Sequence, residues 1–394
     1  MKYLRGYFTA GIFAGITWLL MEYGRRFSTL VDMIYPYVDR GLQGYLAQWS
    51  SQVDFCLWQL LAVALGVLIL ASAVLMVILK WNPIQWGGWV LAVFAAIYML
   101  HTAFFGLNYY AGDLSEDLRM NITTYTLEEL EEATNYYRDH ANALAMSVNR
   151  DAQGYVDFAD FETLANQAGD GFHSLTYDRS YPIFAGSTVP VKKLGWSDMY
   201  TSMGITGFTF GLTGEAAVNP QAPDTGLPFT ICHEMSHRMC IASERDANFA
   251  GFLACIANPS VEFMYSGYYM AFRYCYSALC SVGSFGAAEA AQRVWSGVNE
   301  YLSFDLAAYD YFYSSKKNNT ATKVGDTVND TYLKTSGEIQ GLASYGQVCD
   351  LLVNWYIQEV VLPTLIEEVD PFDPYDPNQV DLSGIVNARN PGNG

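Results

Sequence analysis

The chain has few basic side chains, with 21 Lys and Arg against 40 Asp and Glu among its 394 residues, and its formal net charge is −19. Sequence-independent binding of nucleic acid requires clustered Lys and Arg that neutralise phosphates, so we expect no nucleic-acid partner. Charged residues of both signs make up only 15% of the chain, and aromatic residues another 15%. Disordered chains have the opposite composition, so we expect a folded protein with an ample core.

Charged residues are absent from two long runs near the N-terminus. The first run extends from Phe55 to Leu79, and after the helix-breaking pair Asn82-Pro83 the second extends from Trp86 to about Leu107. A helix rises about 1.5 Å per residue, so each run can cross the roughly 30 Å hydrocarbon core of a bilayer. Trp81, Trp86 and Trp89 lie at one end of the second run and Tyr109 and Tyr110 at the other, as at lipid–water interfaces. We therefore predict transmembrane helices over about 55–79 and 86–107, with the lipid bilayer as a partner.

A shorter apolar stretch, about residues 6–22, follows Lys2 and Arg5 at the N-terminus. No small-x-small cleavage site follows this stretch, so we expect a retained, short or tilted first span rather than a signal peptide. The next segment, residues 23–54, mixes aromatic with polar residues and is expected at the membrane interface. We therefore predict three transmembrane helices within a membrane region over residues 1–107.

Charge divides the chain at about residue 107. The first 107 residues hold six basic and four acidic residues, and the remainder holds 15 basic and 36 acidic residues. We predict a large domain over 108–366 and an acidic Pro/Asp-rich tail over 367–394. The positive-inside count is equal for both orientations of a multi-pass cell-membrane protein. Because Lys2 and Arg5 directly precede the first span, we expect the large domain outside the cytoplasm. The oligomeric state stays open.

The seven cysteines include no CxxC pair and show no disulfide framework, so we expect mainly buried free thiols. Six of them lie outside the predicted spans, an even number that an oxidising compartment also permits. Cys232 and Cys240 cannot be joined if they lie on one helix. Eight residues at about 1.5 Å per residue place their Cα atoms about 12 Å apart, beyond disulfide reach.

Beyond residue 110 the sequence is typical of a mostly helical fold. Thr126 and Glu129 form a capping-box pattern at the start of one helix. Residues 251–303 predict further helices with a break at Asn258-Pro259, and 336–364 predicts an amphipathic helix. Residues 204–219 are rich in Gly, Thr and Phe with partial alternation, which predicts one or two strands. The fold class is therefore α-rich, with a mostly helical α+β domain after the transmembrane helices.

One motif in this domain carries chemistry: His233-Glu234-Met235-Ser236-His237. An HExxH pattern on a helix places two imidazoles one turn apart on one face, where both can bind a single Zn²⁺. Glu234 then lies beside the open coordination position and can accept a proton from a metal-activated water. The chain has only five histidines, so a chance match is rare.

A third protein ligand is needed in such a site. The metzincin pattern requires Gly and His where Cys240 and Ser243 stand, so that class is excluded. Ser243 is a good N-cap for a second helix, whose first turn contains Glu244 and Asp246. Glu244 with Asn248 one turn later matches the gluzincin arrangement, in which Asn248 orients a ligand imidazole from outside the ligand set. Asp246 is the alternative ligand, and both acids also favour the helix N-terminus electrostatically.

The sequence resembles the bacterial membrane family catalogued as domain of unknown function 3810. The matching segments are 106–110, 125–130, 213–219, 227–237, 244–249 and 344–345. The resemblance covers nearly the whole chain to about residue 365, and it implies a membrane-anchored zincin-like zinc peptidase of unknown substrate. Similar sequences usually have Gly where Cys240 stands, so Cys240 either strains a left-handed helix end or offers a thiolate to the metal.

Two function hypotheses remain. The first is a membrane zinc metalloendopeptidase acting on a peptide or protein, with Glu234 as general base, Tyr345 as oxyanion donor and 207–219 as a substrate-binding edge strand. The second is a zinc-stabilised sensor or scaffold without turnover, which would not need Glu234. His173, in an expected loop, is a further candidate to polarise a substrate carbonyl. A transporter is disfavoured because the apolar runs 6–21, 55–79 and 86–107 carry no acid or base besides His101.

Overall fold

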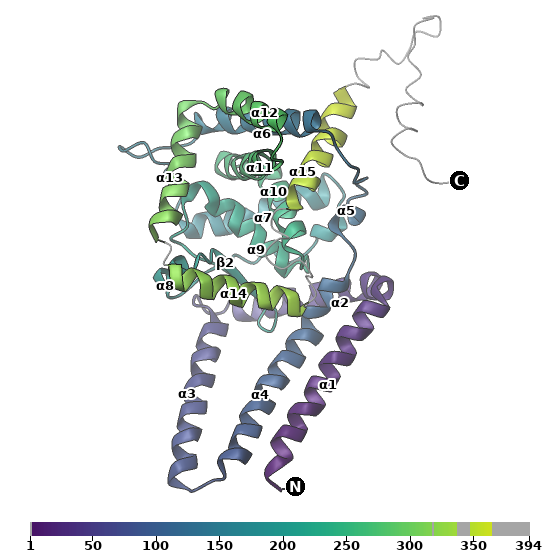
Figure 1. The fold of residues 1–394 in the computed structure, drawn as a ribbon, viewed down its shortest axis with the longest axis vertical. Coiled ribbons are helices and arrows are strands. Elements are labelled where there is room, and N and C mark those ends of the chain that lie inside the picture. Colours follow the sequence, from purple (N-terminus) through teal and green to yellow (C-terminus); the bar gives the residue numbers. More distant parts are fainter. Residues whose placement is uncertain (1, 317–318, 337–346, 365–394) are drawn as a thin grey trace, which may run out of the picture.

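The computed structural model describes residues 2–316, 319–336 and 347–364. Three long helices, α1 (Arg5–Arg26), α3 (Leu57–Ile78) and α4 (Pro83–Phe104), extend side by side from a helical body (Figure 1). The N-terminus and the connection between α3 and α4 lie at the end far from the body. Helix α2 (Ser28–Ser50) runs across the base of the body, next to the ends of the other three helices.

Within the described residues, α3 and α4 are the two helices that are long and apolar enough to cross a membrane. Gln59 is the only buried residue of α3, so its apolar side chains face outward on all sides. This exposed surface supports association with a membrane. Helix α4 begins at Pro83 rather than at Trp86, because the Asn82 side chain accepts from Gln85 N at 3.1 Å and proline favours the first helical position.

Small residues bring α1 and α4 together. A Cβ added to Gly6 would lie 2.5 Å from Trp89 N, and one added to Gly88 would lie 2.7 Å from the Tyr7 ring. One turn further along each helix, Ala10 and Ala92 are buried. Such small-xxx-small contacts are typical of helix pairs in bilayers. Helix α1 itself does not reach the apolarity of α3 and α4, so its crossing stays a prediction.

Helix α2 is fastened to the body as well as to the long helices. Gln43 Nε2 donates to the carbonyls of Gly211 and Phe104 at 3.0 Å each. Arg40 Nε donates to Met239 O at 3.2 Å. Arg40 and Gln43 therefore hold α2 against the body, and Gln43 also links it to the end of α4.

The body is mostly helical, as predicted. Its helices are α5 (Leu114–Asp117), α6 (Leu127–Ala145), α7 (Phe161–Tyr177), α8 (Ser197–Met203), α9 (Leu227–Arg238), α10 (Glu244–Ala257), α11 (Val261–Ser281), α12 (Phe285–Ser296), α13 (Glu300–Lys316), α14 (Asn319–Ser336) and α15 (Val348–Tyr356), the last followed by a π-helical turn over Ile357–Val361. Short 3₁₀ turns occupy Lys2–Leu4, Gly106–Tyr110, Pro182–Phe184 and Asp224–Gly226.

Several local predictions are confirmed. Thr126 and Glu129 form the reciprocal capping box of α6, with bonds of 2.7 and 3.1 Å. Helix α10 ends at Ala257 and α11 begins at Val261, so the helical run is interrupted at Asn258-Pro259. The helix predicted over 336–364 is confirmed from Val348 onward, and its first part lies outside the described residues.

The sheet is small and lies in the half of the body nearer to α3 and α4. Its order is β1 (Lys192–Lys193), β3 (Glu215–Val218), β2 (Gly207–Phe210). Strand β2 pairs antiparallel with β3, with Gly207 opposite Val218, and β1 pairs parallel to β3. The two strands predicted within 204–219 are confirmed, whereas the two-residue β1 was not predicted. Because β3 is central, β2 is an edge strand.

Candidate metal centre

Helix α9 carries the HExxH motif through the interior of the body. All its residues except Thr230 are buried, and Pro228 lies in its first turn, where a missing N–H is tolerated. His233 and His237 are one turn apart, so their rings lie on the same face, with centroids 4.6 Å apart. Helix α10 starts at Glu244, six residues after α9 ends. The short connection returns the first residue of α10 to the histidine face of α9.

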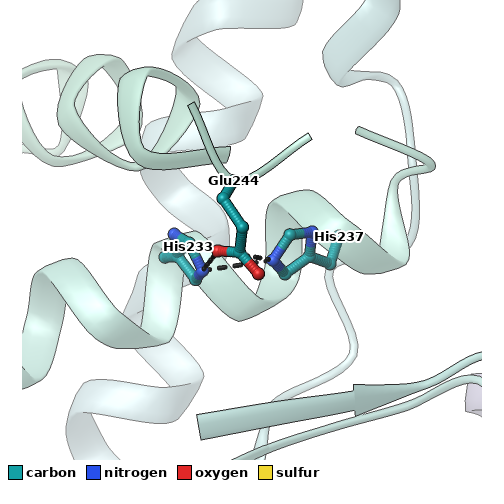
Figure 2. Close-up of side chains that lie close together, drawn as sticks. All are labelled: His233, His237 and Glu244. Carbon is teal, nitrogen blue, oxygen red and sulfur yellow. Dashed lines mark hydrogen bonds and ion pairs between the residues drawn. The ribbon is translucent and has the colours of Figure 1, made fainter. Parts of the chain in front are cut away.

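His233, His237 and Glu244 converge on one point (Figure 2). Glu244 Oε2 lies 3.3 Å from His233 Nε2 and 3.6 Å from His237 Nε2, and the two Nε2 atoms are 3.1 Å apart. Ligand atoms around a tetrahedral zinc, about 2.0–2.2 Å from the ion, are separated by about 3.3–3.6 Å. Two of the three separations fall in this range and the third is slightly shorter, so the three donor atoms are close enough together to bind one metal ion.

The hydrogen bonds around these residues leave the same three atoms available. His237 Nδ1 pairs with Ile241 O at 2.9 Å, which fixes the tautomer with a free lone pair on Nε2. Glu244 Oε2 is buried and, among the described residues, has no hydrogen bond of standard geometry, although both imidazole Nε2 atoms lie within 3.6 Å of it. A buried carboxylate oxygen without a donor is costly, and a cation between the three residues would satisfy it. The residues present therefore fit a divalent metal ion.

The charges of the site are strongly coupled. Burial alone would lower the pKa of His237, but the adjacent Glu244 carboxylate outweighs it and raises that pKa to about 9. Burial alone would raise the pKa of Glu244, but the two imidazoles outweigh it and hold that pKa below its usual range. The Glu244 carboxylate therefore favours a proton on His237 in the metal-free site, and metal binding would displace that proton.

Glu234 lies next to the cluster, and a residue of the sheet hydrogen-bonds to its carboxylate. The Thr209 hydroxyl of β2 donates to Glu234 Oε2 at 2.7 Å. A Cβ on Gly207 would lie 2.6 Å from Glu234 Cγ, so glycine is needed there for the side chain to fit. Burial raises the pKa of Glu234, against the lowering influence of the two histidines. The carboxylate is thus fixed at one oxygen and has a raised affinity for a proton.

These residues open into a cavity of about 460 Å³. Its walls come from β2, α9, α10, α11, α13, α14 and the residues directly after α4. Besides the metal-site residues it is lined by Phe105, Tyr109, Thr209, Met270, Tyr274, Tyr309, Asn329 and Tyr332, among others. A volume of this order, bounded by apolar and a few polar side chains, is typical of ligand-binding clefts.

The other predicted residues have different environments. Asn248 lines the cavity, and its Oδ1 accepts from the Tyr274 hydroxyl at 3.2 Å, so its action on a ligand imidazole stays a prediction. Asp246, the alternative ligand, accepts from Leu114 N at 3.0 Å and lies outside the ligand cluster. Tyr345 lies outside the described residues. His173 is not in a loop: it is exposed on α7.

Cys240 has the backbone expected of a glycine, with φ 72°. Its Sγ lies 3.5 Å from Asp39 Oδ2 and is not one of the clustered metal-binding groups. Of its two predicted roles, the strained helix end is confirmed. All seven cysteines are free, and only Cys280 is exposed, so the prediction of mainly buried thiols is confirmed.

Sequence reasoning missed Thr209, which donates a hydrogen bond to Glu234, and Tyr274, which donates one to Asn248. The alternation in Gly207-Phe208-Thr209-Phe210 was a usable signal for the first, because residues 207 and 209 share one face of a strand. Tyr274 comes from α11, far along the chain, and no local pattern marks it.

Comparison with known proteins identifies a family without a described activity. No curated protein and no solved structure matches the chain. The family model described as "Protein of unknown function (DUF3810)" matches residues 32–353, a span that contains the whole ligand cluster and both apolar helices. The chain therefore belongs to this family.

Proposed function

We propose that the chain is a membrane-anchored zinc metalloendopeptidase. The observation that carries this proposal is the convergence of His233, His237 and Glu244 beside a buried, oriented Glu234 in a cavity bounded by an edge strand. A purely structural zinc site is closed by four protein ligands, whereas three ligands leave one position for water or substrate.

Zinc held by the three ligands would supply Lewis acidity to a water molecule and to a substrate carbonyl. Glu234 Oε2 is held by Thr209, so Oε1 is the oxygen left to accept the proton of the attacking water. Hydrolysis forms one C–O bond, breaks the peptide C–N bond and delivers the proton from Glu234 to the departing amine. The raised pKa of Glu234 suits it to both steps.

Strand β2 supports a peptide as the substrate. It is the edge of the sheet, and residues Ile205, Thr206, Gly207, Phe208 and Thr209 line the cavity. An extended peptide can add to such an edge through main-chain hydrogen bonds, which place the peptide carbonyls along the strand. This mode of binding depends little on the side chains of the peptide. This arrangement favours cleavage within a polypeptide over hydrolysis of a small molecule.

We further propose three membrane spans with the body outside the cytoplasm. Lys2, Arg5 and Lys80 lie at the far end of α1, α3 and α4. At the body end, Arg40 is buried and donates to body carbonyls, and Arg25 and Arg26 pair with Glu22 at 3.0 and 3.3 Å. We take the basic residues at the far end, which lie outside the body, as those that favour the cytoplasmic side.

The test uses the full-length protein in detergent, zinc-loaded, with an unfolded protein as substrate. Glu234→Gln keeps the shape of the side chain but cannot accept a proton, so activity should fall about 10²–10⁴-fold while zinc content stays near one per chain. Glu289→Gln on the exposed surface of α12 is the matched control and should change neither. Zinc binding without cleavage by the wild type would contradict the proposal and favour a metal-stabilised sensor or scaffold.

A further inference from the structure

The candidate metal centre lies at the membrane end of the body. In Figure 1, α9 and α14 occupy the half nearer to α3 and α4, and α6 and α12 lie at the opposite end. The cavity that contains His233 and Glu234 is also lined by Phe105, the residue directly after α4, and by Tyr109. The space for substrate therefore begins where the apolar helix α4 ends.

The edge strand rests on the first turn of α3. Trp58, the second residue of α3, packs against Phe208 and Phe210 of β2, with ring centroids 5.1 and 5.8 Å apart. Glu215 of β3 accepts from the backbone N–H groups of Leu57 and Trp58 at 2.7 and 2.9 Å. A peptide paired with β2 would lie about 4.8 Å further out in the same sheet. It would therefore lie at the height of the bilayer surface, provided α3 and α4 span the membrane.

Helix α14 covers this cavity and is itself attached to α4. Tyr332 lies 3.4 Å from His101 Nε2, and the Tyr98 hydroxyl donates to Thr335 O at 3.1 Å. Val328 lines the cavity and is still 59% exposed, so the mouth of the cavity opens beside α14. The wall that faces substrate is thus built on side chains from the last turns of a membrane-crossing helix.

Apolar side chains continue this surface at the same level. Trp196 is 56% exposed and lines a shallow hollow with Leu60 and Val63 of α3. Met199, in α8, is 48% exposed. Exposed Trp and Met beside the start of an apolar helix suit the boundary between headgroups and acyl chains. If α3 and α4 cross a bilayer, these apolar side chains would lie at its surface, in the same half of the body as the cavity.

We infer, building on the proposed peptidase function, that the substrate is a membrane-tethered polypeptide cut in an extended stretch next to its own transmembrane helix. Three features converge on this occupant: the edge strand fixed to α3, the cavity that starts at the end of α4, and the apolar rim. A chain emerging from the bilayer reaches β2 directly. A chain held far above the bilayer does not.

The experiment compares three substrates with one cleavable sequence, using zinc-loaded full-length protein in phosphatidylcholine–phosphatidylglycerol vesicles. The first substrate joins the sequence directly to an apolar transmembrane helix. The second inserts about ten prolines, a stiff spacer of roughly 30 Å, between helix and sequence. The third is the soluble peptide alone. The first and second share the tether and the vesicle, so only the height above the bilayer differs.

The directly joined substrate should be cleaved about 10²-fold faster than the soluble peptide, because tethering raises its effective concentration. The proline spacer should remove most of that advantage. Equal cleavage of the direct and spaced substrates would overturn the inference and leave the peptidase function standing. No cleavage of any substrate by zinc-loaded wild type would instead contradict the peptidase function, and the inference with it.

Discussion

Helices α3 and α9 depart from the usual distribution of residues in soluble proteins in opposite directions. In α3 the apolar side chains point outward, and Gln59 is the only buried residue. In α9 every residue but Thr230 is buried, although the helix contains two histidines, a glutamate and an arginine. Helix α3 exposes apolar side chains, and helix α9 buries polar and charged ones.

The difference teaches what each helix requires from its surroundings. Exposed apolar residues on all sides of a helix require a non-aqueous neighbour, and lipid is the neighbour that fits its length. Buried polar residues require partners, and Arg238 has them in the carbonyls of Ser187 and Val189. Glu244 Oε2, opposite α9, has no hydrogen bond of standard geometry among the described residues, which is the condition a metal ion would remedy.

The largest expected effect is at the two histidines of α9 that we propose as metal ligands. His237→Ala leaves two protein ligands, so tight zinc binding should be lost and metal content should fall from about one per chain to near zero. Metal analysis of the purified full-length protein measures this. The matched control is His173→Ala, an exposed histidine of α7 that should leave zinc content unchanged. Retention of zinc by His237→Ala would show that the ion is held elsewhere.

A second experiment tests the outward face of α3. Leu68 is 66% exposed, and Leu68→Arg should disfavour insertion by about 2.5–3.5 kcal/mol if that face meets lipid. Phe285 in α12 is 81% exposed, and Phe285→Arg should change stability by no more than about 0.5 kcal/mol because it faces water. Membrane integration, measured by resistance to alkaline extraction, should fall for the first variant only. Equal tolerance of both would place α3 outside the bilayer.

The raised pKa of His237 should also be detectable, because zinc binding should release a proton from this residue. The pKa of His237 is raised to about 9 in the folded, metal-free site, above its ordinary value near 6.5. Between these pH values the site holds a proton that zinc displaces, so zinc affinity should rise up to about tenfold per pH unit and level off above about pH 9. Calorimetry at pH 7.5 in buffers of different ionisation enthalpy should report release of about one proton. A binding enthalpy independent of buffer would contradict this.

The smallest expected effect concerns the end of α9. Cys240→Gly and Cys240→Ala both remove the thiol near Asp39, but only alanine keeps a Cβ at φ 72°. The glycine variant should therefore be more stable than the alanine variant by about 1 kcal/mol, the reverse of the order within a helix. Chemical denaturation of the two variants measures this difference. A more stable alanine variant would show that the strain is relieved by a backbone change.

Local spacing was enough to predict the cluster of His233, His237 and Glu244 and several helices. His233 and His237 are fixed by helical periodicity, and Glu244 by the N-cap pattern at Ser243, so each depends only on residues close in the chain. Contacts between distant segments escaped prediction. Thr209 reaches Glu234 from a strand 25 residues earlier. The residues of α2 pack on carbonyls that the sequence cannot place, since their partners lie more than 60 residues away.

Glu215 determines when, during synthesis, the N-terminal end of α3 can be capped. Its carboxylate holds the first two amides of α3, and also accepts from Lys192 Nζ and from the Thr213 hydroxyl at 2.7 Å each. Leu57 precedes Glu215 by 158 positions, which takes roughly 8 to 30 s to translate at about 5–20 residues per second. Throughout that interval α3 exists without its cap. Helix α3 is synthesised early, but its first amides are bonded only later, when β3 has been made and the body has folded.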